Sequence, residues 1–350
     1  MRHYANARQS TLTRPTKHNG HTMSSHWTPE VSDPFVDRIT IILNLGSHQI
    51  PNTKHDSKSN QPARSVIVRF QRVAAEMKLD PIPMKIGHYG STYLNWKLTL
   101  SKCSVIYGIR RKPNKDGGLS VRIEFNPAKL SSGSINIIES DILELLGFAD
   151  GFSSLLQGAT VTHLDVAVDL FGISLADLFF VGRGATGSVL RGVRTTGKQE
   201  SIWSNEHGLE TVYFRSGARS PSLLLRAYNK KLEQLQRHGI QPLSAAPHTR
   251  VEVAMNRRGV LLNALPSLRS PFSALGLSDV SISEPISAFA DSVRTRGLDA
   301  ARSRHPVESF QVWRLQTSLN SPWWDPINQW KSWPQSLLQS EIGKWISMAA

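Results

Sequence analysis

The stretch 160-TVTHLDVAVDLFG-172 places two carboxylates four residues apart in a segment that otherwise has the composition of a β-strand. Successive side chains of a strand point to opposite faces of its sheet. The even positions from 164 to 170 are all apolar, whereas Asp165 and Asp169 share the other face with His163. We therefore expect both carboxylates to lie on the sheet face that does not form the core.

The same alternation recurs in four further segments. These are 119-LSVRIEFN-126, 209-LETVYFR-215, 222-SLLLRAYNK-230 and 249-TRVEVAM-255. Clean alternation is typical of antiparallel sheets with one covered face and one open face. Segments 139–157, 174–182 and 229–239 are predicted to be helices covering the apolar face, the second on a capping-box pattern. The predicted fold is α+β, with a central antiparallel sheet and helices on one face.

Composition favours a nucleic-acid partner. The chain has 350 residues and a formal net charge of +14, which indicates nucleic acid first and an anionic membrane surface second. The single cysteine, Cys103, excludes an intramolecular disulfide framework and a cysteine-rich zinc site, and it is typical of a reducing compartment. No apolar run reaches the roughly 20 residues of a membrane span. We expect a cytoplasmic protein with no membrane association.

Three regions are predicted along the chain. Residues 1–35 are expected to be a disordered basic arm, 36–260 the sheet domain, and 261–350 a helical, tryptophan-rich region. Within the sheet domain, 36–45 is a further predicted strand and 51–65 a predicted loop. The tryptophans of the C-terminal region are expected to pack in a core, because large aromatics bury much apolar area.

The open face would collect an unusual set of side chains, and its acids suit a metal. It comprises Asp165, Asp169, Glu252, Glu124, His163, Tyr213, Tyr228, Arg226, Lys230, Arg250 and Arg215. Carboxylates with a histidine form an oxygen-rich site suited to Mg²⁺ or Mn²⁺. Arginine and lysine bind phosphodiesters, and a tyrosine hydroxyl can attack phosphorus. On any one strand alone, solvent exposure or cross-strand ion pairing is the commoner explanation of such residues.

Four blocks resemble rolling-circle replication initiators of the plasmid and phage type, including the replication protein of filamentous phages. They are 119-LSVRIEFNPAKL-130, 162-THLDVAVDLFG-172, 209-LETVYFRSGARSPSLLLRAYNKKLEQ-234 and 249-TRVEVAM-255. The resemblance covers about residues 65–260. It implies an enzyme that nicks one DNA strand at an origin through a tyrosine, stays linked to the 5′ phosphate, and later rejoins the strand. It also implies a divalent metal, Mg²⁺ or Mn²⁺, and a host polymerase.

The resemblance assigns roles to individual residues. Tyr213 falls where plasmid-type initiators carry their nucleophile and Tyr228 where filamentous-phage initiators carry theirs. Either attacks alone, or both act in turn; the phage-like 125-FNPAKL-130 slightly favours Tyr228. Asp165 and Glu252 match metal ligands, with Asp169 as a third ligand or an outer partner. His163 replaces an arginine common in relatives, and is a ligand or a simple substitution.

The basic residues complete this assignment. Arg226 and Lys230 would hold phosphate, Lys230 would also assist proton transfer, and the further DNA contacts would be Arg250, Arg215 and Lys231. The chain has no G-x-x-x-x-G-K-[ST] motif, so a host helicase would unwind the DNA. A homodimer is compatible with the sequence. Two competing readings stay open: a non-catalytic DNA- or RNA-binding protein using the same face, and a metal-dependent nuclease without a covalent intermediate.

Overall fold

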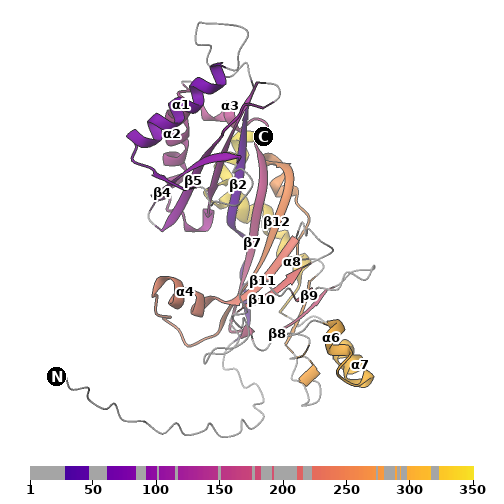
Figure 1. The fold of residues 1–350 in the computed structure, drawn as a ribbon. Helices are drawn as coiled ribbons and strands as arrows, with labels where there is room; N and C mark the ends of the chain where they lie inside the picture. The colour runs from indigo at the N-terminus through magenta and orange to yellow at the C-terminus, as the bar shows by residue number, and fades with distance from the viewer. Residues whose placement is uncertain are drawn as a thin grey trace, which may run out of the picture.

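A large antiparallel sheet and a set of helices make up the structure (Figure 1). The computed structural model describes residues 28–46, 61–83, 92–100, 102–114, 117–148, 151–175, 178–182, 191–192, 211–215, 223–272, 275–279, 288–289, 292, 298–316 and 323–350. The antiparallel sheet and the helices confirm the predicted α+β fold.

The main sheet has 11 strands in the order β3-β4-β5-β6-β2-β7-β12-β11-β10-β9, and β1 also pairs with β7. The strands are β1 Glu30–Val31, β2 Phe35–Leu45, β3 Asp80–Pro81, β4 Tyr93–Leu100, β5 Cys103–Arg110, β6 Leu119–Phe125, β7 Thr160–Phe171, β9 Arg191–Gly192, β10 Thr211–Arg215, β11 Leu223–Asn229 and β12 His248–Leu261. The opening stretch forms β7, which lies between β2 and β12. All six strands expected from alternation or from the 36–45 segment are present.

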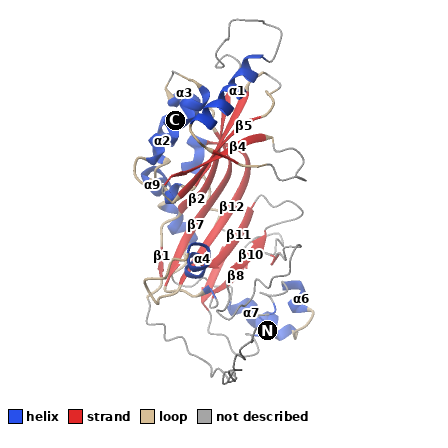
Figure 2. Cartoon of the chain, turned by 60° about the vertical axis from the view of Figure 1, so that its left-hand side comes forward, coloured by secondary structure: helices blue, strands red, loops and turns tan. Residues whose placement is uncertain are grey.

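Helices pack on the apolar side of this sheet, as Figure 2 shows for α2, α3 and α9. The α-helices are α1 Gln61–Glu76, α2 Ser134–Leu146, α3 Phe152–Leu156, α4 Lys230–His238, α6 Leu298–Arg302, α7 Val307–Gln316, α8 Pro326–Lys331, α9 Trp333–Gln339 and α10 Gly343–Ala349. Short 3₁₀ helices, η2 Pro127–Lys129 and η4 Leu262–Ser267, follow β6 and β12. None of the helices in these described ranges is long and apolar enough to span a membrane.

The C-terminal tryptophans belong to the core beneath the sheet. Trp345 of α10 is fully buried and packs against Phe125 of β6 and Phe152 of α3, with ring centroids 5.7 and 5.0 Å apart. Trp333 and Trp324 are also buried, in the same hydrophobic cluster as the strands. The expectation that these aromatics pack is confirmed for these three residues.

Two of the helix predictions need correction. Residues 178–182 form strand β8, not a helix, and pair with β13 Leu275–Asp279 in a separate two-stranded sheet. The run LFFVG is aromatic and apolar, and a short apolar run has no periodicity that separates strand from helix. The expected helix 139–157 divides into α2 and α3, because Gly147 ends α2 in the left-handed conformation at φ 72°.

The remaining local predictions have mixed outcomes. The helix expected over 229–239 is confirmed as α4, which Asn229 caps by accepting a bond from the Leu232 amide and which Gly239 ends. The loop expected over 51–65 is wrong from Gln61 onward, where α1 begins. Residues 1–27 of the expected arm lie outside the described residues, and Glu30–Val31 pairs with β7.

Candidate functional site

Three neighbouring strands position the candidate site. β7, β12 and β11 are adjacent, and their register aligns Asp165 with Ala254, and Glu252 with Arg226. The apolar faces of the same strands are held in the core. The opposite face therefore has a fixed backbone geometry, and its acids and arginines form what we call the polar layer: Asp37, Arg38, Arg122, Glu124, Asp165, Asp169, Arg226, Arg250 and Glu252.

Arg226 joins the two carboxylates at the centre of the polar layer. Its guanidinium group pairs with Glu252 Oε1 and lies 3.7 Å from Asp165 Oδ2. The Tyr228 hydroxyl donates a hydrogen bond to Glu252 Oε2 at 3.4 Å. The structure thus brings four of the predicted site residues together: a phenol, two acids and a guanidinium group, from three strands far apart in the sequence.

The expectation of an open face is wrong for these acids. The side chains of Asp165 and Glu252 are only 3% and 0% exposed, whereas that of Arg226 is 36% exposed. The longer arginine side chain covers the shorter carboxylates, since its aliphatic stem can lie along the sheet while its charged head reaches solvent. A ligand approaching this face would meet guanidinium groups before it met the acids.

Burial shifts the acid–base properties of this cluster. Burial raises the pKa of Glu252 to about 7, although Arg226 opposes the shift, and Asp37 and Asp165 add to it. Burial likewise raises the pKa of the Tyr228 hydroxyl far above its ordinary value. A carboxyl group that titrates near neutrality and accepts the hydrogen bond of a buried phenol is suited to take up its proton.

His163 and Asp165 have the donor chemistry of a metal site. His163 Nε2 lies 2.8 Å from Asp165 Oδ1, a buried oxygen that accepts no hydrogen bond. A nitrogen and an unsatisfied carboxylate oxygen facing each other suit a divalent cation. Within the described part of the chain, no group of three or more His, Cys, Asp or Glu side chains is close enough together to hold one. Glu252 would be the next metal ligand, but its carboxylate is paired with Arg226.

Asp169 belongs to a different cluster. Arg250 donates to both its oxygens, at 2.7 and 2.8 Å, and also to Asp37 at 2.9 Å. His248 Nε2 lies 3.2 Å from the same carboxylate. Burial alone would raise the pKa of Asp169, but the bonds from His248 and Arg250 outweigh it and lower the pKa to about 2. Asp169 is therefore a charged partner of Arg250 and does not share the Arg226 cluster.

The lysines have local partners. Lys230 is buried, pairs with Glu233 at 2.8 Å, and lies 5.5 Å from the centroid of the Tyr228 ring. Lys231 donates to the carbonyl oxygens of Ser244 and Ala246, so it fastens α4 to the chain that leads into β12.

The second candidate nucleophile lies on the neighbouring strand. Tyr213 of β10 is paired in register with Arg226, and Arg215 with Leu224. The side chains of Tyr213 and Arg215 lie outside the described part of the structure.

Sequence reasoning missed Arg38 and Asp37. Arg38 pairs with Glu124, which also binds Arg122. A register shift in β2 between Val36 and Arg38 places Arg38 opposite Asp165 and inserts Asp37 as an extra residue. A bulge breaks the two-residue alternation. The only available signal was therefore the presence of charged residues in an otherwise apolar strand.

No protein-family model matches the chain, and no curated protein matches it.

We expect Asp169→Asn to lower the free energy of unfolding by about 2 kcal/mol at pH 7, because a carboxyl pKa lowered from 3.8 to about 2 favours the folded state. The stabilisation is present above the unfolded-state pKa and is lost as the pH falls through the folded-state value. The difference in unfolding free energy between Asp169→Asn and the unchanged protein should therefore narrow below about pH 4 and nearly vanish at about pH 2. Urea denaturation across this range measures it.

The exposed Asp33 provides the control. Asp33→Asn should change the unfolding free energy by less than about 0.5 kcal/mol. A deficit for Asp169→Asn that stays constant with pH would show that the lost stability does not come from ionisation.

Proposed function

We propose that this chain is a rolling-circle replication initiator, a DNA nicking-joining enzyme that attacks a phosphodiester through Tyr228. The observation that supports it best is the hydrogen bond from the Tyr228 hydroxyl to Glu252, a carboxylate that also shares Arg226 with Asp165. A nucleophile beside a base, with the base oriented by a third group, is the arrangement of nucleophilic catalysis. The formal charge of +14 suits a DNA substrate.

The nicking step uses the groups of this cluster. The Tyr228 oxygen bonds to phosphorus while its proton passes to Glu252, whose pKa of about 7 suits a proton acceptor at neutral pH. The bond from phosphorus to the 3′ oxygen breaks, and that oxygen leaves as a hydroxyl after taking a proton, a role that we assign to Lys230, 5.5 Å from the centroid of the Tyr228 ring. The product is a 5′-phosphotyrosyl link and a free 3′ hydroxyl. Rejoining is the reverse reaction.

Arg226 has the role of binding the phosphate. A guanidinium group recognises the oxygens of a phosphodiester through paired hydrogen bonds. Arg226 is the most exposed member of the central cluster, so it can turn from the carboxylates to the incoming strand. Tyr213, which pairs with Arg226 on the adjacent strand, is the alternative nucleophile or the second of a pair acting in turn.

A divalent cation would be held by Asp165 and His163, with Glu252 adjoining. Mg²⁺ or Mn²⁺ bound there would polarise the phosphate and stabilise the charge that develops during attack. Host polymerase and helicase, and a homodimeric state, belong to the same proposal. The helicase is included because the sequence has no G-x-x-x-x-G-K-[ST] motif.

A non-catalytic nucleic-acid-binding role is the second candidate. It is favoured by the observation that Arg226 already pairs with both Glu252 and Asp165, as expected for purely structural ion pairs. Incubation with supercoiled DNA and Mg²⁺ or Mn²⁺ separates the two: an initiator converts it to the open circle, whereas a binding protein only retards it. A nuclease without a covalent intermediate would open the circle and leave no protein on the 5′ end.

Tyr228→Phe should reduce formation of the covalent DNA adduct by at least about 100-fold, because the attacking oxygen is lost. Adduct is measured by denaturing electrophoresis with a labelled single-stranded substrate, and Mn²⁺ binding should survive. Tyr107→Phe is the control, since that buried hydroxyl bonds Asp141 on the opposite side of the sheet. Loss of the adduct in Tyr213→Phe instead of Tyr228→Phe would identify Tyr213 as the nucleophile. Full nicking by the double variant would exclude the tyrosine mechanism.

The nicking rate should rise with pH through about 7 and then level off, because Glu252 accepts the proton only when it is ionised. Glu252→Gln should lower the rate by about 10²- to 10⁴-fold and abolish this rise. Glu139→Gln, which alters an acid that bonds Trp345 beneath the sheet, should keep the profile. An unchanged pH profile in Glu252→Gln would exclude Glu252 as the proton acceptor.

Asp165→Asn should weaken metal-dependent cleavage by at least about tenfold while DNA binding is kept or strengthened, because removal of a negative charge favours phosphate. Cleavage per bound complex and Mn²⁺ affinity are the two measurements. Collapse of DNA binding with normal cleavage per complex would contradict the assignment of Asp165 to the metal.

A further inference from the structure

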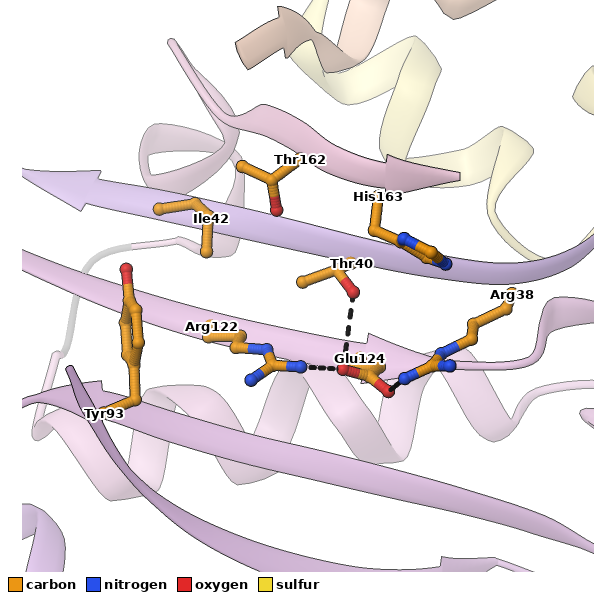
Figure 3. Close-up of a pocket in the computed structure, with 8 residues that line it drawn as sticks. All are labelled: Arg38, Thr40, Ile42, Tyr93, Arg122, Glu124, Thr162 and His163. Carbon is orange, nitrogen blue, oxygen red and sulfur yellow. Dashed lines mark hydrogen bonds and ion pairs between the residues drawn. The ribbon is translucent and has the colours of Figure 1, made fainter. Parts of the chain in front are cut away.

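A cavity of about 330 Å³ opens on the polar side of the sheet, and Figure 3 shows the residues that line it. Side chains of β2, β4, β6 and β7 line it. Those that matter chemically are Arg38, Thr40, Tyr93, Arg122, Glu124 and His163. Its volume lies at the lower end of the range of ligand pockets, which begins at about 300 Å³.

Two guanidinium groups share one carboxylate at the floor of this cavity. Arg38 pairs with Glu124 Oε1 and Arg122 with Oε2, and they approach it from opposite sides in Figure 3. Thr40 donates to Oε2 at 3.4 Å, so both oxygens of Glu124 are engaged. Burial alone would raise the pKa of Glu124, but Arg122 and Arg38 outweigh it and lower the pKa. Glu124 therefore stays ionised and holds both guanidinium groups in place.

This arrangement leaves the cavity with a net positive charge and unused donors. An arginine has five N–H donors, and one carboxylate shared by two arginines cannot engage all of them. The side chains of Arg38 and Arg122 are 49% and 30% exposed, while that of Glu124 is 6% exposed. An incoming ligand would thus contact guanidinium groups in preference to the acid, which favours an anion over a cation.

The surroundings favour a nucleotide phosphate among anions. Arg38 is paired in register with Asp165, and Thr40 with His163, so the cavity adjoins the candidate nicking centre directly. Tyr93 contributes an aromatic ring to the wall. Guanidinium forks bind phosphate oxygens, and aromatic rings stack on bases, which together form the usual site for single-stranded nucleic acid.

We propose that this cavity is a nucleotide-binding subsite, in which Arg38 and Arg122 grip a phosphate group next to the one that is cleaved and Tyr93 stacks on its base. The role of the subsite rests on the proposed function. Binding of a phosphate at the subsite requires neither cleavage nor a metal ion. A phosphate of a DNA strand and that of a free nucleotide share this chemistry.

Binding of a fluorescent oligothymidylate to the full chain, without divalent metal, provides the first test. Arg122→Gln should weaken binding by about tenfold or more and reduce the slope of log affinity against log salt by about 0.7, the value for one phosphate contact on a single strand. Arg72→Gln removes the same charge from the exposed α1 helix, where Arg72 pairs with Glu76, and should leave the slope unchanged. Equal effects of the two substitutions would overturn the proposal.

A second measurement avoids any risk that a substitution disturbs folding. In the unchanged protein, the oligothymidylate should protect Arg38 and Arg122, but not Arg72, from modification by phenylglyoxal, as read by mass spectrometry. Protection by thymidine 5′-monophosphate at similar concentration would identify a free nucleotide as the source, and protection by the strand alone would identify DNA. Protection by neither would overturn the subsite.

These outcomes are separable from the fate of the nicking mechanism. Protection of Arg38 and Arg122 without a tyrosine adduct would support the subsite and contradict the proposed nicking function. A tyrosine adduct without protection would support the nicking function and contradict the subsite.

Discussion

The ion pair between Arg226 and Glu252, in the middle of a buried sheet surface, is the interaction on which the candidate site depends. A carboxylate that is fully buried without a partner would cost several kcal/mol. Arg226 offsets part of that penalty and reaches Asp165 as well. Because the apolar faces of β7, β11 and β12 are fixed in the core, the backbone positions that carry Arg226 and both acids have little freedom to separate. The same packing that stabilises the sheet therefore keeps a phenol and a base in contact.

Two acids on adjacent strands acquire opposite properties from their surroundings. Asp169 accepts two bonds from Arg250, and its lowered pKa keeps it charged at any ordinary pH. Glu252 is more deeply buried and lies near other acids, and its pKa is raised towards neutrality. Pairs of carboxylates pushed apart in this way commonly divide structural and proton-transfer roles. The Asp169 carboxylate is thus held in a permanent ion pair with Arg250, whereas Glu252 at the centre of the polar layer can change its charge.

The alternation of side chains was sufficient to predict β6, β7, β10, β11 and β12, because most of their cross-strand pairs on the core face match apolar with apolar positions, as Val253 with Val166. It could not predict that β2 lies between β6 and β7, since both pairings join residues at least 74 positions apart, as Leu45 with Leu119. The pairing of Arg38 with Asp165 was therefore not predicted. Nor could it predict burial of Asp165 and Glu252, which depends on how arginines from other strands fold over them.

The charge of the polar layer differs from that of the whole chain. Its acids, Asp37, Glu124, Asp165, Asp169 and Glu252, exceed its guanidinium groups, those of Arg38, Arg122, Arg226 and Arg250, by one negative charge when all are ionised. The excess of +14 must therefore be carried by other residues.

Long-range attraction of DNA would accordingly come from the rest of the chain, while the layer contributes orientation. A phosphate brought close to Asp165 would meet repulsion there, because like charges a few ångströms apart in a partly buried site repel each other strongly. A divalent cation held by Asp165 and His163 would reverse the sign of the local charge. This gives a physical reason for cleavage to depend on metal even if DNA binding does not. The positively charged cavity beside Arg38 would bind a neighbouring phosphate without a metal ion.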